Sequence, residues 1–522
     1  MKKLEEVLED WEAVIGLEVH TELTTLKTKM FCNCKLEFGA EPNTHTCPIC
    51  LGLPGALPVP NKAAIESIVL AGLATNCDIE KHSMFYRKNY MYPDMSKNFQ
   101  TTQGPVAFCM RGHLDLHVDG PGVQERYGIS SLDVGESREN IERTEEGYDA
   151  HVGITRIHME EDAGKMIHIG GSEGRIAGAT HSLVDYNRCG TPLIELVTEP
   201  DLRTPEEARL FMQKLRQIYL AIGISDCSME EGSMRCDGNI SLRRRGTKEF
   251  GTKTELKNMN SFKNLHDGLA YEICRQAEVL EEGGVIYQET RHWDPSAKRT
   301  IVMRVKETAD DYRLFPEPDM APFDLSDEFI ARVQDRLPEL PDEKALRYEE
   351  EYKLSSYDAR HLIEDQANAE VFEETIAIAG VKLAKPLANL LINEVAAYAK
   401  NHDDFKLEES FLSPARLAQL IQLQAEDVIS SKQVKQVFAF VLEEDKDPET
   451  IVEERGMKQV SDTGAIEAVV DAVLAANPDK VEQYQAGKKG LIGFFVGQCM
   501  KEMRGQGNPK LINKLLAEKL DA

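Results

Sequence analysis

The spacing of apolar residues changes from the period of a strand to the period of a helix at a proline-rich segment. Upstream of it, runs such as VIGLEVHTEL at residues 14–23 alternate apolar and polar residues, as a β-strand with one buried face does. Downstream, runs such as KPLANLLINEVAAYAK at residues 385–400 place apolar residues at helical spacing. The prolines between the two regions are Pro316, Pro318, Pro322, Pro338 and Pro341. Because proline interrupts helices and strands, this segment is predicted to link a β-rich domain to a helical one.

The upstream region combines many strand-like runs with two helical patterns, at residues 63–76 and 204–223. This mixture predicts an α+β fold class with antiparallel pairing. A chain of 522 residues is also long enough for several domains. We predict an N-terminal antiparallel-sheet cradle domain at 1–325, an all-α helical domain at 326–455 and a small helical tail domain at 456–522.

The strand predicted at residues 14–23 carries a specialised polar face. Glu18, His20 and Glu22 share one face, while Ile15 and Leu17 belong to the apolar face. Two carboxylates that flank an imidazole can bind a divalent cation or transfer protons. The alternative interpretation is an ordinary solvated sheet face.

Four cysteines follow this strand closely. Cys32 and Cys34 are one residue apart, Cys47 and Cys50 form CPIC, and twelve residues separate the two pairs. This spacing suits two short turns that close a tetrahedral sulfur site, so it predicts structural zinc. A redox CxxC would stand alone beside a βαβ pattern, and a disulfide framework would need an oxidising compartment. Free cytosolic cysteines are the remaining alternative.

Three later segments also have the pattern of a strand with a charged face. The polar residues on these faces are Arg156, His158, Glu160 and Asp162 in GITRIHMEEDAGK, Arg235, Asp237 and Asn239 in MRCDGNISL, and Lys253, Glu255 and Lys257 in GTKTELKN. Adjacent faces of this kind would form a cradle that mixes carboxylates with cations. Such a lining suits Mg²⁺ beside a nucleotide phosphate, because the metal needs oxygen ligands and the phosphates need cations. Each strand alone also fits a solvated antiparallel sheet.

The charge distribution restricts where a nucleic acid could bind. The formal net charge is −28, so most of the surface would repel a phosphate backbone. Residues 488–522 have the opposite sign, with seven Lys or Arg against three Asp or Glu. The cations that could contact an RNA backbone are Lys488, Lys489, Lys501, Arg504, Lys510 and Lys514. An ordinary lysine-rich, solvated helix pair is the alternative.

Several common signatures are absent from the sequence. No run approaches the ~18 uncharged apolar residues of a membrane span, and the first residues lack the apolar centre of a secretory signal. We therefore expect a cytoplasmic protein without membrane contact. No GxxxxGK[ST] phosphate loop occurs, so that motif gives no basis for ATP binding. There is also no serine-rich amidase segment and no convincing cysteine nucleophile, so any ammonia used would come from another chain.

The motifs together resemble a known family. VIGLEVHTEL, FGAEPNTHTCPICLGLPGALPVPN, RKNYMYPDM, HMEEDAGK, SLVDYNRCGTPLIELVTEPD, MEEGSMRCDGNISL, TKTELKNMNSF, YRLFPEPDM and LPELPDE resemble the B subunit of the tRNA-dependent amidotransferase. The resemblance covers nearly the whole chain. GFFVGQCMK and GNPKLINKLL resemble the tail domain that this family shares with small YqeY-like proteins, for which we expect a tRNA-binding role.

The resemblance implies a ligase that uses glutamine as amido donor. ATP would phosphorylate the side-chain carboxylate of glutamate or aspartate mischarged on tRNA, and ammonia would then displace phosphate. The products would be Gln-tRNA(Gln), Asn-tRNA(Asn) or both. The A subunit would release ammonia from glutamine, and a small C subunit would complete a heterotrimer. The competing hypothesis is a non-catalytic, zinc-containing tRNA-binding scaffold subunit.

The resemblance also implies roles for individual residues. His20, Glu160 and Glu195 would hold Mg²⁺, and Glu18 would lie beside them to support the metal or orient the substrate or ammonia. Lys165, Arg235 and Lys257 are expected to contact phosphates, argued from their charge and from the family-like segments that contain them. The four cysteines match the zinc knuckle of the family, which would brace the cradle without taking part in chemistry.

Two segments depart from the shorter members of the family. Residues 105–150 form a long acidic insertion, and SEGRIAGATH at residues 172–181 is a shorter one. Neither removes a residue assigned to the site. We expect them to affect contacts with tRNA or with partner chains rather than the reaction.

Overall fold

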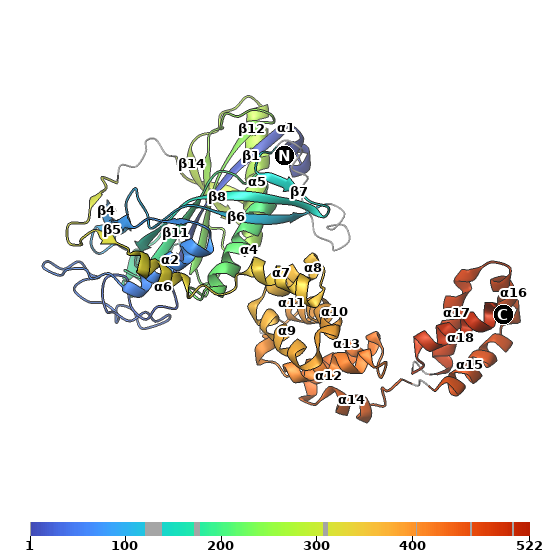
Figure 1. Cartoon of the computed structure of the whole chain (residues 1–522). Helices are drawn as coiled ribbons and strands as arrows, with labels where there is room; N and C mark the ends of the chain where they lie inside the picture. The colour runs from blue at the N-terminus through green and yellow to red at the C-terminus, as the bar shows by residue number, and fades with distance from the viewer. Residues whose placement is uncertain are drawn as a thin grey trace. The chain divides into compact units, whose positions relative to one another are not determined.

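The computed structural model describes residues 2–120, 138–171, 178–305, 312–402, 405–459, 462–503 and 506–521. It separates into two compact units, Met1–Leu340 and Pro341–Ala522 (Figure 1). The first unit contains the strands and the second is helical among its described residues. This confirms the predicted α+β class. The finer divisions at 325 and 455 stay predictions.

A thirteen-stranded sheet organises the first unit. Ten strands follow the order β15-β14-β13-β12-β1-β11-β8-β5-β4-β16, while β2, β6 and β7 pair off this path. Their bounds are β1 Trp11–Glu22, β2 Asp78–Ile79, β4 Phe85–Asn89, β5 Phe99–Gln103, β6 Cys109–Asp119, β7 Ile141–Arg143, β8 Gly147–Glu161, β11 Pro192–Thr198, β12 Met234–Arg244, β13 Thr254–Lys257, β14 Glu289–Asp294, β15 Arg299–Val305 and β16 Phe315–Pro316. Among the described strands, β13 and β14 run parallel and the other pairs run antiparallel.

Two small sheets and five helices complete the described part of this unit. The small sheets pair β9 Lys165–Ile169 with β10 His181–Asp185, and β3 His82–Ser83 with β17 Phe323–Asp324. The helices are α1 Leu4–Asp10, α2 Lys62–Ala74, α4 Pro205–Ala221, α5 Phe262–Glu281 and α6 Asp327–Gln334. The helices predicted at 63–76 and 204–223 are thus confirmed as α2 and α4.

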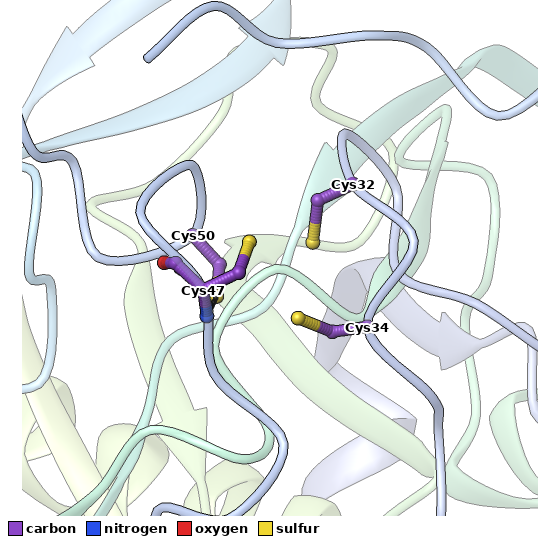
Figure 2. Close-up of side chains that lie close together, drawn as sticks. All are labelled: Cys32, Cys34, Cys47 and Cys50. Carbon is purple, nitrogen blue, oxygen red and sulfur yellow. Dashed lines mark hydrogen bonds between the residues drawn. The ribbon is translucent and has the colours of Figure 1, made fainter. Parts of the chain in front are cut away.

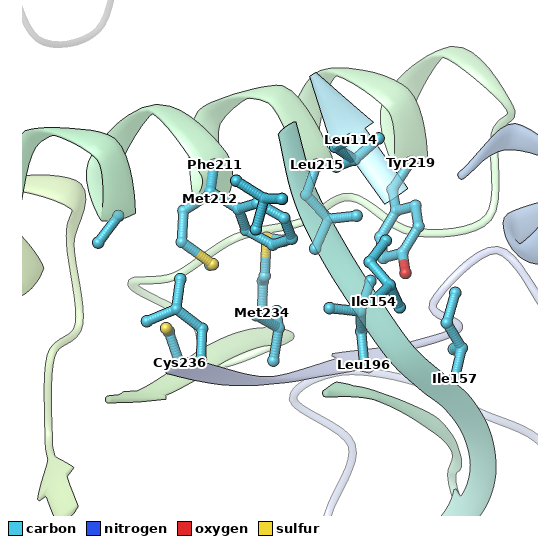
Figure 3. Close-up of a cluster of buried hydrophobic side chains, with 14 of the residues drawn as sticks. Leu114, Ile154, Ile157, Leu196, Phe211, Met212, Leu215, Tyr219, Met234 and Cys236 are labelled. Atoms are coloured by element: carbon cyan, nitrogen blue, oxygen red, sulfur yellow. The ribbon is translucent and has the colours of Figure 1, made fainter. Parts of the chain in front are cut away.

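Helix α4 covers one face of the large sheet. Its N-terminus is capped by Thr204, whose hydroxyl accepts a hydrogen bond of 3.1 Å from the Glu207 amide, and Pro205 fits the first helical turn. Phe211 and Leu215 point from α4 toward Leu196 of β11 and Met234 of β12 (Figure 3). Burying each such side chain contributes roughly 1.5–3 kcal/mol. Because side chains alternate along a strand, the residues next to Leu196 and Met234 in sequence project from the opposite face.

The second unit is built from short amphipathic helices around two hydrophobic cores. Its helices are α7 Pro341–Tyr352, α8 Ser356–Ile363, α9 Gln366–Ala379, α10 Ala384–Asn389, α11 Ala396–Lys400, α12 Pro414–Ala425, α13 Ser431–Glu444, α14 Pro448–Glu454, α15 Thr463–Ala475, α16 Pro478–Gln485, α17 Ile492–Glu502 and α18 Pro509–Asp521. A π-helical turn at Leu390–Val395 joins α10 to α11, so the helix predicted at 385–400 forms with a wider turn at its centre. One core lies within residues 345–452 and the other within residues 466–520. No helix of the described residues is both long and apolar enough to cross a membrane.

Candidate functional site

Strand register brings the predicted site residues together on the sheet face opposite α4. In β1, His20 lies across from Glu195 of β11 on one side and from Arg235 of β12 on the other. Glu195 in turn lies across from His158 of β8. Four strands that are distant in sequence therefore contribute neighbouring polar side chains. We call this polar face of β8, β11, β1, β12 and β13 the cradle.

Three predicted magnesium ligands converge within the cradle. His20, Glu160 and Glu195 each place one donor atom so that all three atoms lie within 4.8 Å of one another. The Nε2 atom of His20 is 3.5 Å from a carboxylate oxygen of Glu195. Glu160 is buried, and it accepts hydrogen bonds of 2.9 Å from the Thr102 hydroxyl and 3.0 Å from the Gln100 amide. Two carboxylates and one imidazole at this separation can hold a divalent cation, because all three are common ligands of such ions.

His158 occupies the centre of this cluster, although its sequence pattern suggested no specific role. Its Nε2 atom lies 3.1 Å from Glu160 and 3.2 Å from Glu195, and the ring is buried. Burial opposes protonation of this imidazole, but hydrogen bonds to the two carboxylates and their charges raise its pKa to about 9. Burial also opposes ionisation of Glu195, but its interactions with His158 and His20 hold its pKa well below the usual value. The alternation of HMEE placed His158 and Glu160 on one face, but only the register reveals the contact with Glu195.

Carboxylates and cations on the β12 and β13 side already form pairs. Lys257 contacts Asp237 and lies 3.1 Å from Glu255. Burial opposes the charge of Lys257, but these two anions raise its pKa above the ordinary value. The amide of Asn239 donates a hydrogen bond of 2.9 Å to Glu18. The structure thus places Glu18 and Lys257 on the cradle, as the strand pattern predicted.

The other two residues expected to contact phosphate have different positions. Arg235 lies on the cradle, where its guanidinium is 2.5 Å from Asp162 and 3.6 Å from Glu22. Lys165 is exposed at the start of β9 and lies opposite Asp185 in a separate two-stranded sheet. β8 ends at Glu161, and the chain leaves the large sheet before Lys165. A phosphate-binding role for either residue stays a prediction.

The four cysteines of the predicted zinc site cluster in the loops after β1. Cys32 and Cys34 lie on one loop and Cys47 and Cys50 on another, with their sulfur atoms facing a common space (Figure 2). All four sulfur atoms lie within 4.8 Å of one another. A tetrahedral ion with metal–sulfur bonds of ~2.3 Å would place them about 3.8 Å apart, so the four thiols are close enough to one another to hold such an ion.

The electrostatics around these cysteines favour a thiolate at Cys50. Its pKa is lowered to about 4, first by the hydrogen bond from Cys32 and also by the charge of Lys29. The ammonium of Lys29 is fully buried, 3.7 Å from the Cys50 sulfur and 3.0 Å from the Tyr186 carbonyl oxygen. No sequence pattern indicated this lysine, because the contact joins a residue before the first pair of cysteines to the last cysteine of the second pair.

The tail residues predicted to contact RNA lie on the surface. Lys488, Lys489, Lys501, Lys510 and Lys514 are all exposed. The Lys489 ammonium lies 2.5 Å from a carboxylate oxygen of Asp521, which reduces the local positive charge. Arg504 lies outside the described residues. The RNA-binding role stays a prediction.

The predicted insertions are described only in part. Residues 105–120 and 138–150 contribute β6, β7 and the start of β8, while residues 121–137 lie outside the described chain. Of the shorter insertion, residues 172–177 also lie outside it. The expected effect of both segments on binding therefore stays a prediction.

The fold and the site define a class of protein that has a mostly antiparallel sheet with a charged polar face, a tetracysteine cluster in the loops after β1, and a helical second unit. Residues 13–331 match the family described as the GatB/GatE catalytic domain, and residues 370–520 match the GatB domain. The chain therefore belongs to the GatB family. This confirms the resemblance that the sequence motifs indicated.

Full-length relatives carry a consistent name. The B subunit of the aspartyl/glutamyl-tRNA(Asn/Gln) amidotransferase of Carboxydothermus hydrogenoformans is 48% identical over 513 residues, which cover 98% of this chain and 99% of the relative. Proteins of the same name from Geobacter sp. strain M21 and Persephonella marina are 47% and 46% identical, with 98% of this chain covered in each case and 99% and 100% of the relatives. The similarity thus extends over both units of the chain.

Proposed function

We propose that this chain is the B subunit of a heterotrimeric, tRNA-dependent amidotransferase that acts in the cytoplasm. The substrate would be glutamate or aspartate mischarged on tRNA, and the products Gln-tRNA(Gln) or Asn-tRNA(Asn). The observation that carries the proposal is the convergence of His20, Glu160 and Glu195 beside Arg235 and Lys257 in a member of the GatB family. An A subunit would supply ammonia from glutamine, and a small C subunit would complete the complex.

The chemistry consists of two substitutions. A side-chain carboxylate oxygen of the aminoacyl group attacks the γ-phosphorus of ATP, and the bond to ADP breaks to give an acyl phosphate. The lone pair of ammonia then attacks the acyl carbon, inorganic phosphate leaves, and the amide nitrogen loses a proton. The first step brings two anions together, so the site must neutralise both while it excludes water.

His20, Glu160 and Glu195 are the residues proposed to hold Mg²⁺. Their donor atoms converge within 4.8 Å, and the pKa values of both carboxylates are lowered, which favours the ionised form that a metal ion requires. A bound Mg²⁺ would neutralise charge on the phosphates during transfer. Glu18, held by Asn239, lies on the same strand as His20 and is placed to orient the substrate or ammonia.

Arg235 and Lys257 are proposed to bind phosphate by exchanging partners. Each is paired with a carboxylate, Asp162 and Asp237 respectively. An incoming phosphate offers the same cation more oxygen acceptors, so it can compete for the ion pair. Lys165 would contribute only from its separate two-stranded sheet.

Structural zinc is proposed at Cys32, Cys34, Cys47 and Cys50. The support is the number of thiols, their separation and the lowered pKa of Cys50. Zinc would fix two loops that follow the catalytic strand β1. The basic residues of the tail would contact the tRNA backbone, which adds affinity without sequence selectivity.

A non-catalytic scaffold would not need the cradle. Burying Glu160 and His158 together on a sheet face costs desolvation energy, and a scaffold role would not require that arrangement. We therefore favour the catalytic role.

The test uses the reconstituted heterotrimer with mischarged tRNA. The Glu160→Gln variant should release ammonia from glutamine at the normal rate, yet form neither ADP nor amidated product in response to the mischarged tRNA. Glu142→Gln, which changes an exposed carboxylate on β7, is the matched control and should retain full amidation. Normal amidation by Glu160→Gln would refute the assignment of the site.

A further inference from the structure

Histidines and aspartates alternate along β6 on the face that does not enter the core. His113, Asp115 and His117 point away from Leu114 and Leu116, which are buried. The alternation places all three side chains on one side of the strand. This side is open to solvent, since the Asp115 side chain is 61% exposed.

The neighbouring strand adds a third histidine. His151 of β8 lies directly opposite Asp115, with its Nδ1 atom 2.8 Å from the Asp115 carboxylate, and its side chain is 56% exposed. His113 lies opposite Gly153, which has no side chain to separate the two imidazoles. The rings of His113 and His151 accordingly lie with their centroids 4.5 Å apart.

The donor atoms of these three residues are close enough for one ion. One nitrogen of each histidine and one Asp115 oxygen all lie within 4.8 Å of one another. Two ligands at 90° around a metal, with bonds of about 2.1 Å, are about 3.0 Å apart. The distance between His151 and Asp115 already meets this requirement, and the partly exposed His113 ring can close the remaining gap by a small rotation.

We propose that His113, Asp115 and His151 form a binding site for a divalent transition metal. Two imidazoles and one carboxylate favour Zn²⁺, Ni²⁺, Co²⁺ or Cu²⁺ over Mg²⁺ and Ca²⁺, which prefer oxygen ligands. The three protein ligands leave positions on the solvent side for water or for a donor group of a partner. The metal would tie β6 to β8 across the register pair formed by Asp115 and His151.

This site is separate from the cradle and from the tetracysteine cluster. His151 and His158 are seven residues apart on the same strand, which corresponds to about 23 Å. The proposal therefore does not depend on the proposed amidotransferase activity. It also does not depend on zinc at the cysteines.

The test titrates Ni²⁺ into the full-length chain, without an affinity tag and already loaded with Zn²⁺ so that the thiols are occupied. Isothermal titration calorimetry in excess Mg²⁺, which occupies the proposed site at His20, Glu160 and Glu195, should show one Ni²⁺ site per chain. His113→Asn and His151→Asn should each weaken Ni²⁺ binding at least tenfold, because each removes one of three ligands. Ni²⁺ should also raise the melting temperature of the unaltered protein but not of either variant.

The matched control is His82→Asn. His82 is an exposed histidine that pairs with a single aspartate, Asp324. This pair offers a metal two ligands, whereas the proposed site offers three. Its loss should leave Ni²⁺ affinity unchanged, and circular dichroism should show that all variants are folded. Absence of Ni²⁺ binding to the unaltered chain, or unchanged affinity in both the His113 and His151 variants, would overturn the proposal.

Discussion

His20 of β1 lies directly opposite Glu195 of β11, with 3.5 Å between the imidazole Nε2 atom and a carboxylate oxygen. The two residues are 175 positions apart in a chain of 522, and the pairing of β1 with β11 joins them. Their contact joins β1 to β11 within the cradle. Substitutions of the charged residues around this contact, such as His158 and Lys257, should therefore change the activity of the site.

Replacing His158 should disable the cradle without unfolding the sheet. His158→Asn removes the positive partner that lies 3.1 Å from Glu160 and 3.2 Å from Glu195, leaving one buried and one partly buried carboxylate poorly compensated. Loss of a charged hydrogen-bond partner costs about 1.5–3 kcal/mol, which corresponds to at least a tenfold lower rate of tRNA-dependent ADP formation. Glutamine hydrolysis in the heterotrimer should be unchanged. His168→Asn, on the separate β9 strand, is the control.

Lys257→Met should raise the KM for ATP. The ammonium of Lys257 is one of the cations on the cradle, and its loss leaves Asp237 and Glu255 to repel the nucleotide phosphates. We expect at least a tenfold increase in KM, measured by steady-state kinetics with saturating mischarged tRNA. Lys253→Met removes a nearby exposed lysine of the same segment and should change KM little. If both substitutions raised the KM equally, the effect would come from the net charge of the region, and a direct contact between Lys257 and phosphate would be refuted.

The strand pattern predicted individual faces of the cradle but not their assembly. Alternation in VIGLEVHTEL placed Glu18 and His20 together, because a strand has a period of two whatever its neighbours are. It could not reveal that β1 pairs with both β11 and β12, because strand order depends on the fold of the whole unit.

An irregularity in β8 shows the same limit. The pairing of β11 with β8 shifts register between Val197 and Thr198. Ile154 and Ile157 are both buried although they are three positions apart, so strict alternation fails between them. His151 and His158 consequently face the same side of the sheet, which a continuous period of two would have excluded. The Cys32–Cys50 cluster was predictable because its ligands are close in sequence, whereas the contact of Lys29 with Cys50 required the folded loop.

Metal removal should loosen the loops after β1. Cys47→Ser, or treatment with a strong zinc chelator, should release one Zn²⁺ per chain and lower the melting temperature, because metal binding to such a site contributes directly to folding. Metal content is measured by atomic absorption and stability by differential scanning calorimetry. Cys274→Ala alters a cysteine on α5 that lies outside the cluster, and it should retain the zinc. Zinc retained by Cys47→Ser would contradict a four-cysteine site.

Truncating Phe211 should destabilise the first unit strongly. Phe211 is fully buried between α4 and the sheet (Figure 3). A Phe→Ala change in such a core costs about 3–5 kcal/mol, from lost burial and from the cavity it leaves. The unfolding transition of this unit, followed by tryptophan fluorescence of Trp11 and Trp293, should move to lower urea concentration. Gln217→Ala, at a partly exposed position of the same helix, should shift the transition far less.

The basic tail gives a prediction about salt dependence. Replacing Lys488, Lys501 and Lys514 with Gln removes three exposed positive charges from the tail. If each contacts one phosphate, the slope of log affinity against log salt should fall by roughly two to three, because each contact releases about 0.7–0.9 counterions. Filter binding of tRNA at several salt concentrations measures this slope. Changing Lys382, Lys400 and Lys432, exposed lysines outside the tail, should alter it less.

Deleting residues from 462 onward should weaken tRNA binding further while glutamine hydrolysis persists, since we assign that reaction to the A subunit. An unchanged salt slope in both the triple variant and the deletion would exclude the tail from tRNA binding.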